Sequence, residues 1–216
     1  MIISLTGPQW FYGIGSGFEI ILGFVAFLIA MLSLKAFKLS TDKKYYYFSF
    51  SFFLISLAYF LTGVSKFAML THVLNQLTAI LQQFDFIFFL HVLLIIFAYM
   101  ILLIITLKIN RNKKAIGLLF GVSLLFVAFS YQYFLKFHLV LLLLLFFLAL
   151  KYFENAADKK TINSGLVFTA FYFLMIGQVF ALCVILMPGL VILGELFQLL
   201  GFLMLFGMFV KVLKHG

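Results

Sequence analysis

Leu34–Lys44 reads LKAFKLSTDKK, and 116 residues later Leu150–Lys160 reads LKYFENAADKK, with six of the eleven positions identical. In both copies a long apolar run ends at Leu-Lys, a short polar turn contains Asp-Lys-Lys, and a second apolar run follows. Similarity at one fixed offset is typical of an internal repeat. We interpret the two stretches as equivalent loops of a duplicated unit. Convergence is the alternative, because lysine-rich turns often reuse Asp.

The composition predicts that the chain lies in a lipid bilayer. Hydrophobic residues make up 66% of the sequence and charged residues 10%, whereas soluble domains are about half apolar and about a quarter charged. The net charge of +9 comes from basic residues in short gaps between apolar runs. A nucleic-acid-binding protein would instead gather such charge on a soluble face. The expected partner is therefore the lipid bilayer and not nucleic acid.

Seven apolar runs approach the length of about twenty residues that a helix needs to cross the hydrocarbon core. They cover residues 14–36, 46–66, 86–107, 115–134, 138–153, 165–187 and 190–210. The fifth run is the doubtful one because it is short, and we count it because the next loop must return to the same side. The sequence thus predicts an all-α, polytopic membrane protein, with residues 1–216 forming a single transmembrane domain.

The basic residues predict the orientation of the bundle. Thirteen of the fifteen Lys and Arg residues follow the first, third, fifth and seventh runs, which leaves Lys66 and Lys136 at the other ends. Because basic residues concentrate in cytoplasmic loops, we expect the N-terminus outside and the C-terminus in the cytoplasm, in a plasma membrane. A wrong helix count would scatter these charges over both sides, so their alternation supports seven crossings.

The repeated stretch divides the seven helices into three, one and three. Repeat one would cover about 14–108, a linker helix about 115–134, and repeat two about 138–214, as parallel repeats. This plan resembles the transporter, opsin and receptor superfamily that includes SWEET transporters and microbial rhodopsins. The resemblance rests on architecture alone. The seventh run has its first lysine at Lys211, at the cytoplasmic end, so no retinal cofactor is expected, and the spans lack the prolines of SWEET transporters.

Five polar side chains inside the apolar runs form the candidate ligand-binding or proton-binding site. Ionisable groups are costly in a bilayer, so each is a functional candidate. At about 1.5 Å per residue, all five lie in the outer halves of their helices: Glu19, His91, Gln178, Glu195 and Gln198. Glu195 is the first candidate acid, because it lies deepest and Gly194 permits close helix approach. The alternative is that these groups only bond one another and join helices.

Two features before the third apolar run are interpreted as structural. Asp85 is expected to cap the third helix at the membrane interface. Residues 71–84 have apolar side chains at helical spacing. We expect this segment to lie on the membrane or to extend the third helix, with a lid over an outer opening as the alternative.

Two functions remain open from the sequence. The first is a small-solute or proton-coupled transporter whose halves rock around an outward-facing polar cavity. The second is a sensory or receptor-like module that binds a small or lipophilic ligand and signals through a membrane partner. A homo-oligomer is also left open. The four histidines lack metal-ligand spacing and no catalytic motif is present, so we expect neither a metal site nor an enzyme.

Overall fold

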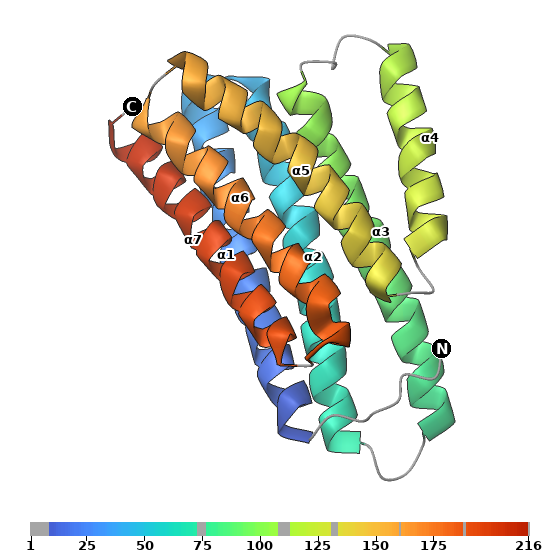
Figure 1. Cartoon of the computed structure of the whole chain (residues 1–216). Helices are drawn as coiled ribbons and strands as arrows, with labels where there is room; N and C mark the ends of the chain where they lie inside the picture. The colour runs from blue at the N-terminus through green and yellow to red at the C-terminus, as the bar shows by residue number, and fades with distance from the viewer. Residues whose placement is uncertain are drawn as a thin grey trace.

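The computed structural model describes residues 9–72, 77–107, 113–130, 134–159, 161–187 and 189–215 (Figure 1). These residues fold into helices and turns, without a strand among them. The helices are α1 (Gln9–Ser40), α2 (Lys43–His72), α3 (Leu77–Thr106), α4 (Lys113–Ser130), α5 (Phe134–Lys159), α6 (Ile162–Leu182) and α7 (Leu190–His215), with a 3-10 helix at Cys183–Ile185. The predicted all-α fold class is confirmed over this part of the chain.

Six of the described helices are long and apolar enough to cross a membrane, and α4 is the shorter one, with its apolar part at Ile116–Phe129. The expected spans need two corrections. The doubtful fifth span, expected over 138–153, belongs to the 26-residue α5, because the helix begins earlier and continues through polar residues to Lys159. The fourth span, expected over 115–134, ends at Ser130.

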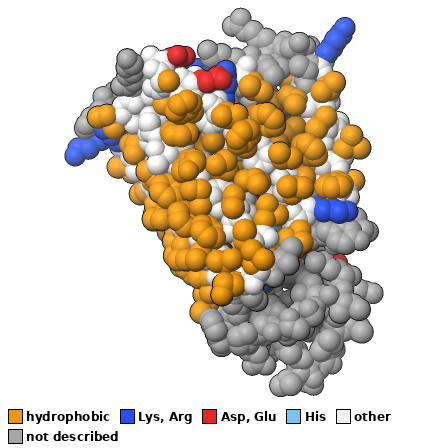
Figure 2. Space-filling model, in the orientation of Figure 1, with side chains coloured by type: hydrophobic (Ala, Val, Ile, Leu, Met, Phe, Trp, Pro, Cys, Tyr) orange, Lys and Arg blue, Asp and Glu red, His pale blue; other side chains and the backbone are white. Residues whose placement is uncertain are grey.

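Large apolar side chains cover the flank of the bundle that Figure 2 shows, and the charged side chains of that face lie mostly toward its upper end. On three different helices, Phe24, Leu125 and Leu203 are 55%, 69% and 45% exposed. An apolar surface this extensive is unfavourable in water and suits the hydrocarbon core of a bilayer. With six helices of sufficient length, the chain is a multi-pass membrane protein.

Six helices close a ring, in the order α1, α2, α3, α5, α6, α7 and back to α1. In the described part of the chain, α4 packs only against α3 and α5, outside this ring (Figure 1). The odd-numbered helices run in one direction and the even-numbered ones return. We call the end with the first residues of α1, α3, α5 and α7 the cavity end. The opposite end, with the α1–α2 and α5–α6 turns, is called the lysine-rich end.

The two Asp-Lys-Lys stretches lie at the α1–α2 and α5–α6 connections, but their secondary structure differs. In the first, α1 ends at Ser40, Thr41 adopts a left-handed φ of 56°, and Asp42 accepts a hydrogen bond from the backbone N–H of Lys44 at 3.0 Å. In the second, α5 continues through Asp-Lys to Lys159. The reason is local: Ala156 and Ala157 replace Ser40 and Thr41, and alanine is the strongest helix former.

The second turn ends at Thr161, which caps α6. Its backbone is extended, with φ −93° and ψ 146°, and its side-chain oxygen accepts a hydrogen bond from the backbone N–H of Ser164 at 3.3 Å. We expect Thr161→Ala to lower the free energy of unfolding by about 1 kcal/mol, because that N–H loses its side-chain acceptor. Chemical unfolding in detergent measures this change. Thr161→Asn should restore stability, and equal losses in both variants would contradict the capping role.

The buried faces of the two halves match when residues 119 positions apart are compared. The following pairs are all at most 3% exposed: Leu22 with Leu141, Ala26 with Leu145, Ile29 with Leu148, Phe52 with Phe171, and Ile55 with Leu174. The ends of α1 and α5, at Ser40 and Lys159, are separated by the same 119 positions. These buried positions thus match at an offset of 119 residues, three more than the offset of 116 between the repeated stretches.

Glycines let α6 and α7 touch. A Cβ added to Gly177 would lie 2.8 Å from the carbonyl oxygen of Gly194, and one added to Gly194 would lie 2.8 Å from the carbonyl oxygen of Gly177. Neither position has room for a side chain, so the two backbones meet directly, as in other small-residue helix crossings. The close approach expected at Gly194 is confirmed.

Candidate functional site

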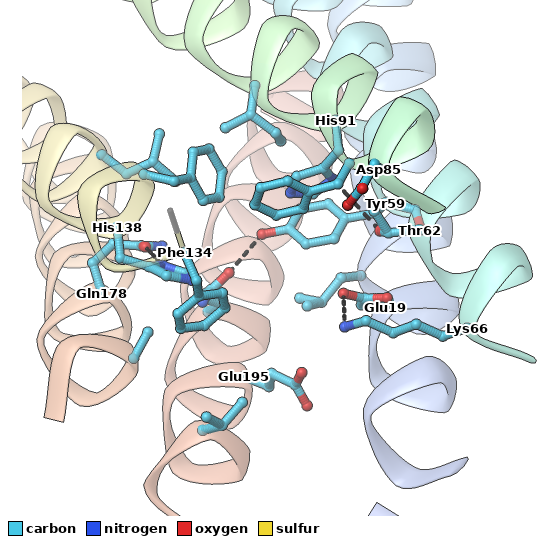
Figure 3. A pocket seen from close by; sticks show the side chains of 18 residues that line it. Glu19, Tyr59, Thr62, Lys66, Asp85, His91, Phe134, His138, Gln178 and Glu195 are labelled. Atoms are coloured by element: carbon cyan, nitrogen blue, oxygen red, sulfur yellow. Dashed lines mark hydrogen bonds and ion pairs between the residues drawn. The ribbon is translucent and has the colours of Figure 1, made fainter. Parts of the chain in front are cut away.

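A cavity of about 240 Å³ lies between the six ring helices, toward the cavity end (Figure 3). The structure brings all five predicted site residues to its wall: Glu19, His91, Gln178, Glu195 and Gln198. They come from α1, α3, α6 and α7, and α4 supplies none of the lining. Each of the five is at most 9% exposed. The site is thus buried within the bundle and built by both halves of the chain.

An ion pair joins α1 to α2 on the cavity wall. Lys66 Nζ donates to Glu19 Oε1 at 2.6 Å, and the two side chains are 29% and 11% exposed. Gly63, one turn before Lys66, lets the helices approach, because a Cβ there would lie 2.9 Å from Ile20 Cγ1 and 3.3 Å from Glu19 Cβ. The acid in α1 is therefore balanced by a cation from the neighbouring helix.

Two short hydrogen bonds join helices at the cavity. The Tyr59 hydroxyl donates to Gln198 Oε1 at 2.5 Å, joining α2 to α7. His138 Nδ1 lies 2.6 Å from Gln178 Oε1, joining α5 to α6. Because an amide oxygen can only accept, Nδ1 of this histidine carries the hydrogen. Both glutamines are thus held by partners on neighbouring helices and present fixed amide groups to the cavity.

His91 is fixed by the backbone of α2 and by aromatic rings. Its Nδ1 lies 3.1 Å from the carbonyl oxygen of Ala58 and 3.5 Å from the Thr62 hydroxyl. Its ring packs against Phe88 at 6.4 Å and against Phe137 at 5.4 Å between centroids. With Nδ1 donating to the carbonyl, Nε2 is the acceptor of the neutral ring. The imidazole therefore has one fixed tautomer and an aromatic surround.

Of the two buried acids that line the cavity, Glu19 is paired with Lys66, whereas Glu195 has no salt-bridge partner in the described part of the chain. The side chain is 9% exposed, and its Oε2 is buried without a hydrogen-bond partner among the described residues. Gly15 of α1 leaves space beside it, since a Cβ there would lie 3.6 Å from Glu195 Oε1. Figure 3 shows the carboxylate projecting from α7 toward α1, near Glu19 and Lys66. An unsatisfied buried carboxylate is costly and calls for an explanation.

Asp85 also lines the cavity, which corrects its expected role as a helix cap. It lies inside α3, eight residues after the helix begins at Leu77. Residues 77–84 have apolar positions at helical spacing and extend the third helix, which was one of the two structural expectations for this segment. Asp85 therefore lies within the helix and not at its start. Residues 73–76 of the same segment lie outside the described residues, so the lid stays untested.

Besides Asp85, four polar lining residues were not predicted as part of the site: Tyr59, Thr62, Lys66 and His138. Two signals in the sequence pointed toward them. Lys66 was one of only two basic residues expected at the cavity end, where a cation faces the outer acids. His138 is the first residue of its expected apolar run, on the same outer side as the other candidates. Among the described residues, no group of three His, Cys, Asp or Glu side chains could hold a metal ion.

Comparison of the chain with protein-family models, with curated proteins and with solved structures gave no match.

An aromatic layer lies directly below the cavity, toward the lysine-rich end. Phe202, one turn beyond Gln198, packs against Tyr59 at 6.1 Å and Phe52 at 5.8 Å between ring centroids. Phe52 in turn stacks on Phe48 at 4.9 Å. Phe52 and Phe202 are fully buried. We call Phe48, Phe52, Phe202 and the neighbouring Phe209 the aromatic floor.

Buried serines near the aromatic floor do not form a polar path through it. Ser49 and Ser56 donate across to carbonyl oxygens of α1, at Ala30 and Gly23, with distances of 2.7 and 2.8 Å. Ser51 donates to the carbonyl of Tyr47 in its own helix at 3.0 Å. Ser49 and Ser56 thus join α2 to α1, and Ser51 bonds within α2. Among the described lining residues, the polar side chains reach as far as Tyr59 and Gln198, beside Phe202 of the aromatic floor.

Proposed function

We propose that the protein is a receptor-like seven-helix module that binds a small ligand in the cavity from the outer side and signals through a membrane partner. The observation that carries this proposal is the aromatic floor: polar side chains from several helices converge on a cavity, and fully buried phenylalanines lie below it. A ligand bound there contacts several helices at once. It can therefore favour one packing of the ring over another.

The orientation in this proposal follows from charge. Lysines gather at the lysine-rich end, in the α1–α2 and α5–α6 turns and in the last turns of α7. The positive-inside rule assigns that end to the cytoplasm. The cavity then faces outward across a plasma membrane, and the short cytoplasmic turns and helix flanks are what a partner protein would contact.

A small-solute transporter is the second candidate, and the ring order favours it. If α1, α2 and α3 exchange places in the ring with α5, α6 and α7, the cyclic order of the six helices is unchanged. The matching of buried positions at 119 residues supports the same pairing. Two parallel three-helix repeats joined by α4 would agree with the plan of the transporter, opsin and receptor superfamily. Such repeats can rock around a central site.

Cysteine labelling separates these two candidates. In a Cys183→Ser background, which removes the only cysteine, we expect Val191→Cys on the cavity wall to react with a membrane-impermeant thiol reagent from outside only. Ile55→Cys, fully buried at the depth of the aromatic floor, should react from neither side. Glu154→Cys, at the lysine-rich end, is the orientation control and should react from the cytoplasmic side.

The contrary results are equally specific. Reaction of Ile55→Cys from the cytoplasmic side would mean that the aromatic floor opens, and it would favour transport over sensing. Reaction of Val191→Cys only from the cytoplasmic side would reverse the orientation and overturn the outward-facing cavity. Uptake of a ligand into proteoliposomes, lost on blocking the cavity with the reagent at Val191→Cys, would replace the receptor proposal by the transporter.

A further inference from the structure

The charges on the cavity wall are unbalanced. Among the described residues that line it, three carry carboxylates, Glu19, Asp85 and Glu195, whereas Lys66 is the only Lys or Arg. Lys66 is bound to Glu19 at 2.6 Å. An anionic ligand would therefore compete with Glu19 for this cation and would face the other two acids. A cationic ligand meets neither difficulty.

Glu195 supplies the position at which a cation would be held. Its Oε2 is buried without a hydrogen-bond partner in the described part of the chain, and the residue as a whole is 9% exposed. The carboxylate lines the cavity, and its other oxygen lies beside Gly15 of α1, where an added Cβ would be 3.6 Å from Oε1. A buried carboxylate is favourable when a charged donor reaches it, because such hydrogen bonds are the stronger ones.

The remaining wall suits the apolar part of an organic cation. Phe88, Phe134 and Phe137 line the cavity together with Tyr59. Aromatic faces attract ammonium groups, most strongly where water is excluded. The volume of about 240 Å³ is below that of typical drug-sized pockets. A molecule with one ring or a short alkyl chain would fill such a space.

We propose that the ligand is a small organic ammonium ion, held by the Glu195 carboxylate and surrounded by the aromatic side chains of α2, α3 and α5. This inference rests on the proposed ligand-binding function and assigns its chemical class. The fixed amides of Gln178 and Gln198 line the same space. They provide neutral hydrogen-bonding groups beside the charged one.

The test compares three molecules of similar shape and different charge. The full-length protein in lipid nanodiscs is titrated by calorimetry with 2-phenylethylammonium, with neutral 2-phenylethanol and with anionic phenylacetate. We expect the ammonium ion to bind at least about tenfold more tightly than the alcohol, the difference that a charged hydrogen bond contributes. Phenylacetate should bind more weakly than both.

Variants assign the preference to Glu195. Glu195→Gln should bring the affinities for the ammonium ion and the alcohol within about twofold, because the amide lacks the charge. Glu195→Asp keeps the charge and should keep the preference, which provides a second measurement if the first variant folds poorly. Glu154→Gln, outside the cavity at the lysine-rich end, is the matched control and should leave all three affinities unchanged.

The outcomes separate the two levels of the proposal. Binding of the alcohol or of phenylacetate as tightly as the ammonium ion overturns the assigned class but supports a ligand-binding cavity. A cation preference that survives Glu195→Gln overturns the role of this carboxylate. Saturable binding of none of the three molecules overturns both the chemical class and the proposed ligand-binding function.

Discussion

Gly177→Ala is expected to lower the free energy of unfolding by about 2–3 kcal/mol, the cost of overpacking a tight interior. The added Cβ would lie 2.8 Å from the carbonyl oxygen of Gly194 and 2.7 Å from Gln198 Cγ. The backbone atom cannot turn aside, so α6 and α7 must separate. Steric trapping or chemical unfolding of the protein in detergent measures the change.

The same helix offers a matched control. A Cβ on Gly165 would meet nothing within 4 Å, so Gly165→Ala should be neutral or stabilising by up to about 1 kcal/mol, as alanine favours helix over glycine. Similar stability of the two alanine variants would show that α6 and α7 are not in backbone contact. The clash should also weaken ligand binding, because Gln198 would have to move from Tyr59, its partner at 2.5 Å.

Lys66→Met is expected to lower the free energy of unfolding by about 2 kcal/mol. The substitution leaves Glu19, with its side chain 11% exposed, without the cation that lies 2.6 Å away. Removing one partner of a buried pair typically costs about 3–5 kcal/mol, and the 29% exposure of the Lys66 side chain reduces this through solvent screening. The measurement is again equilibrium unfolding in detergent.

A second substitution and a surface pair provide the controls. Lys66→Met combined with Glu19→Gln should recover most of the loss, because no uncompensated charge remains. Lys44→Met breaks the exposed pair with Asp42 at 3.8 Å and should change stability by less than about 1 kcal/mol. A double variant as unstable as Lys66→Met alone would rule out the ion pair as the cause.

The lengths of the apolar runs predicted the helices, and the depth of the charged residues within these runs predicted the cavity. Both can be read from the order of residues along the chain. The depth of Glu19 and Glu195 could be counted from the ends of their apolar runs, and these acids do line one cavity. Which helix faces meet could not be predicted in this way. Lipid is apolar, so a face turned to lipid and a face turned to the core have the same composition.

The missed residues illustrate this limit. Tyr59 lies in a run of apolar and aromatic residues, and its importance comes from Gln198, 139 positions away. Lys66 was counted for topology alone, although its partner Glu19 lies on the adjacent helix. The repeated Asp-Lys-Lys was found in the sequence at an offset of 116 residues, but the buried positions of the two halves match at an offset of 119. Two alanines that prolong α5 account for the shift.

The position of α4 has a consequence for how the chain can be divided. A chain that crosses a membrane three times ends on the side opposite to its start. It must cross once more before a second set of three helices can run in the same directions. Among the described residues, α4 runs opposite to α3 and α5, packs beside them and contributes nothing to the cavity wall. Every described side chain around the cavity therefore comes from two separate segments, α1–α3 and α5–α7, and we expect substitutions on the surface of α4 to leave the cavity lining unchanged.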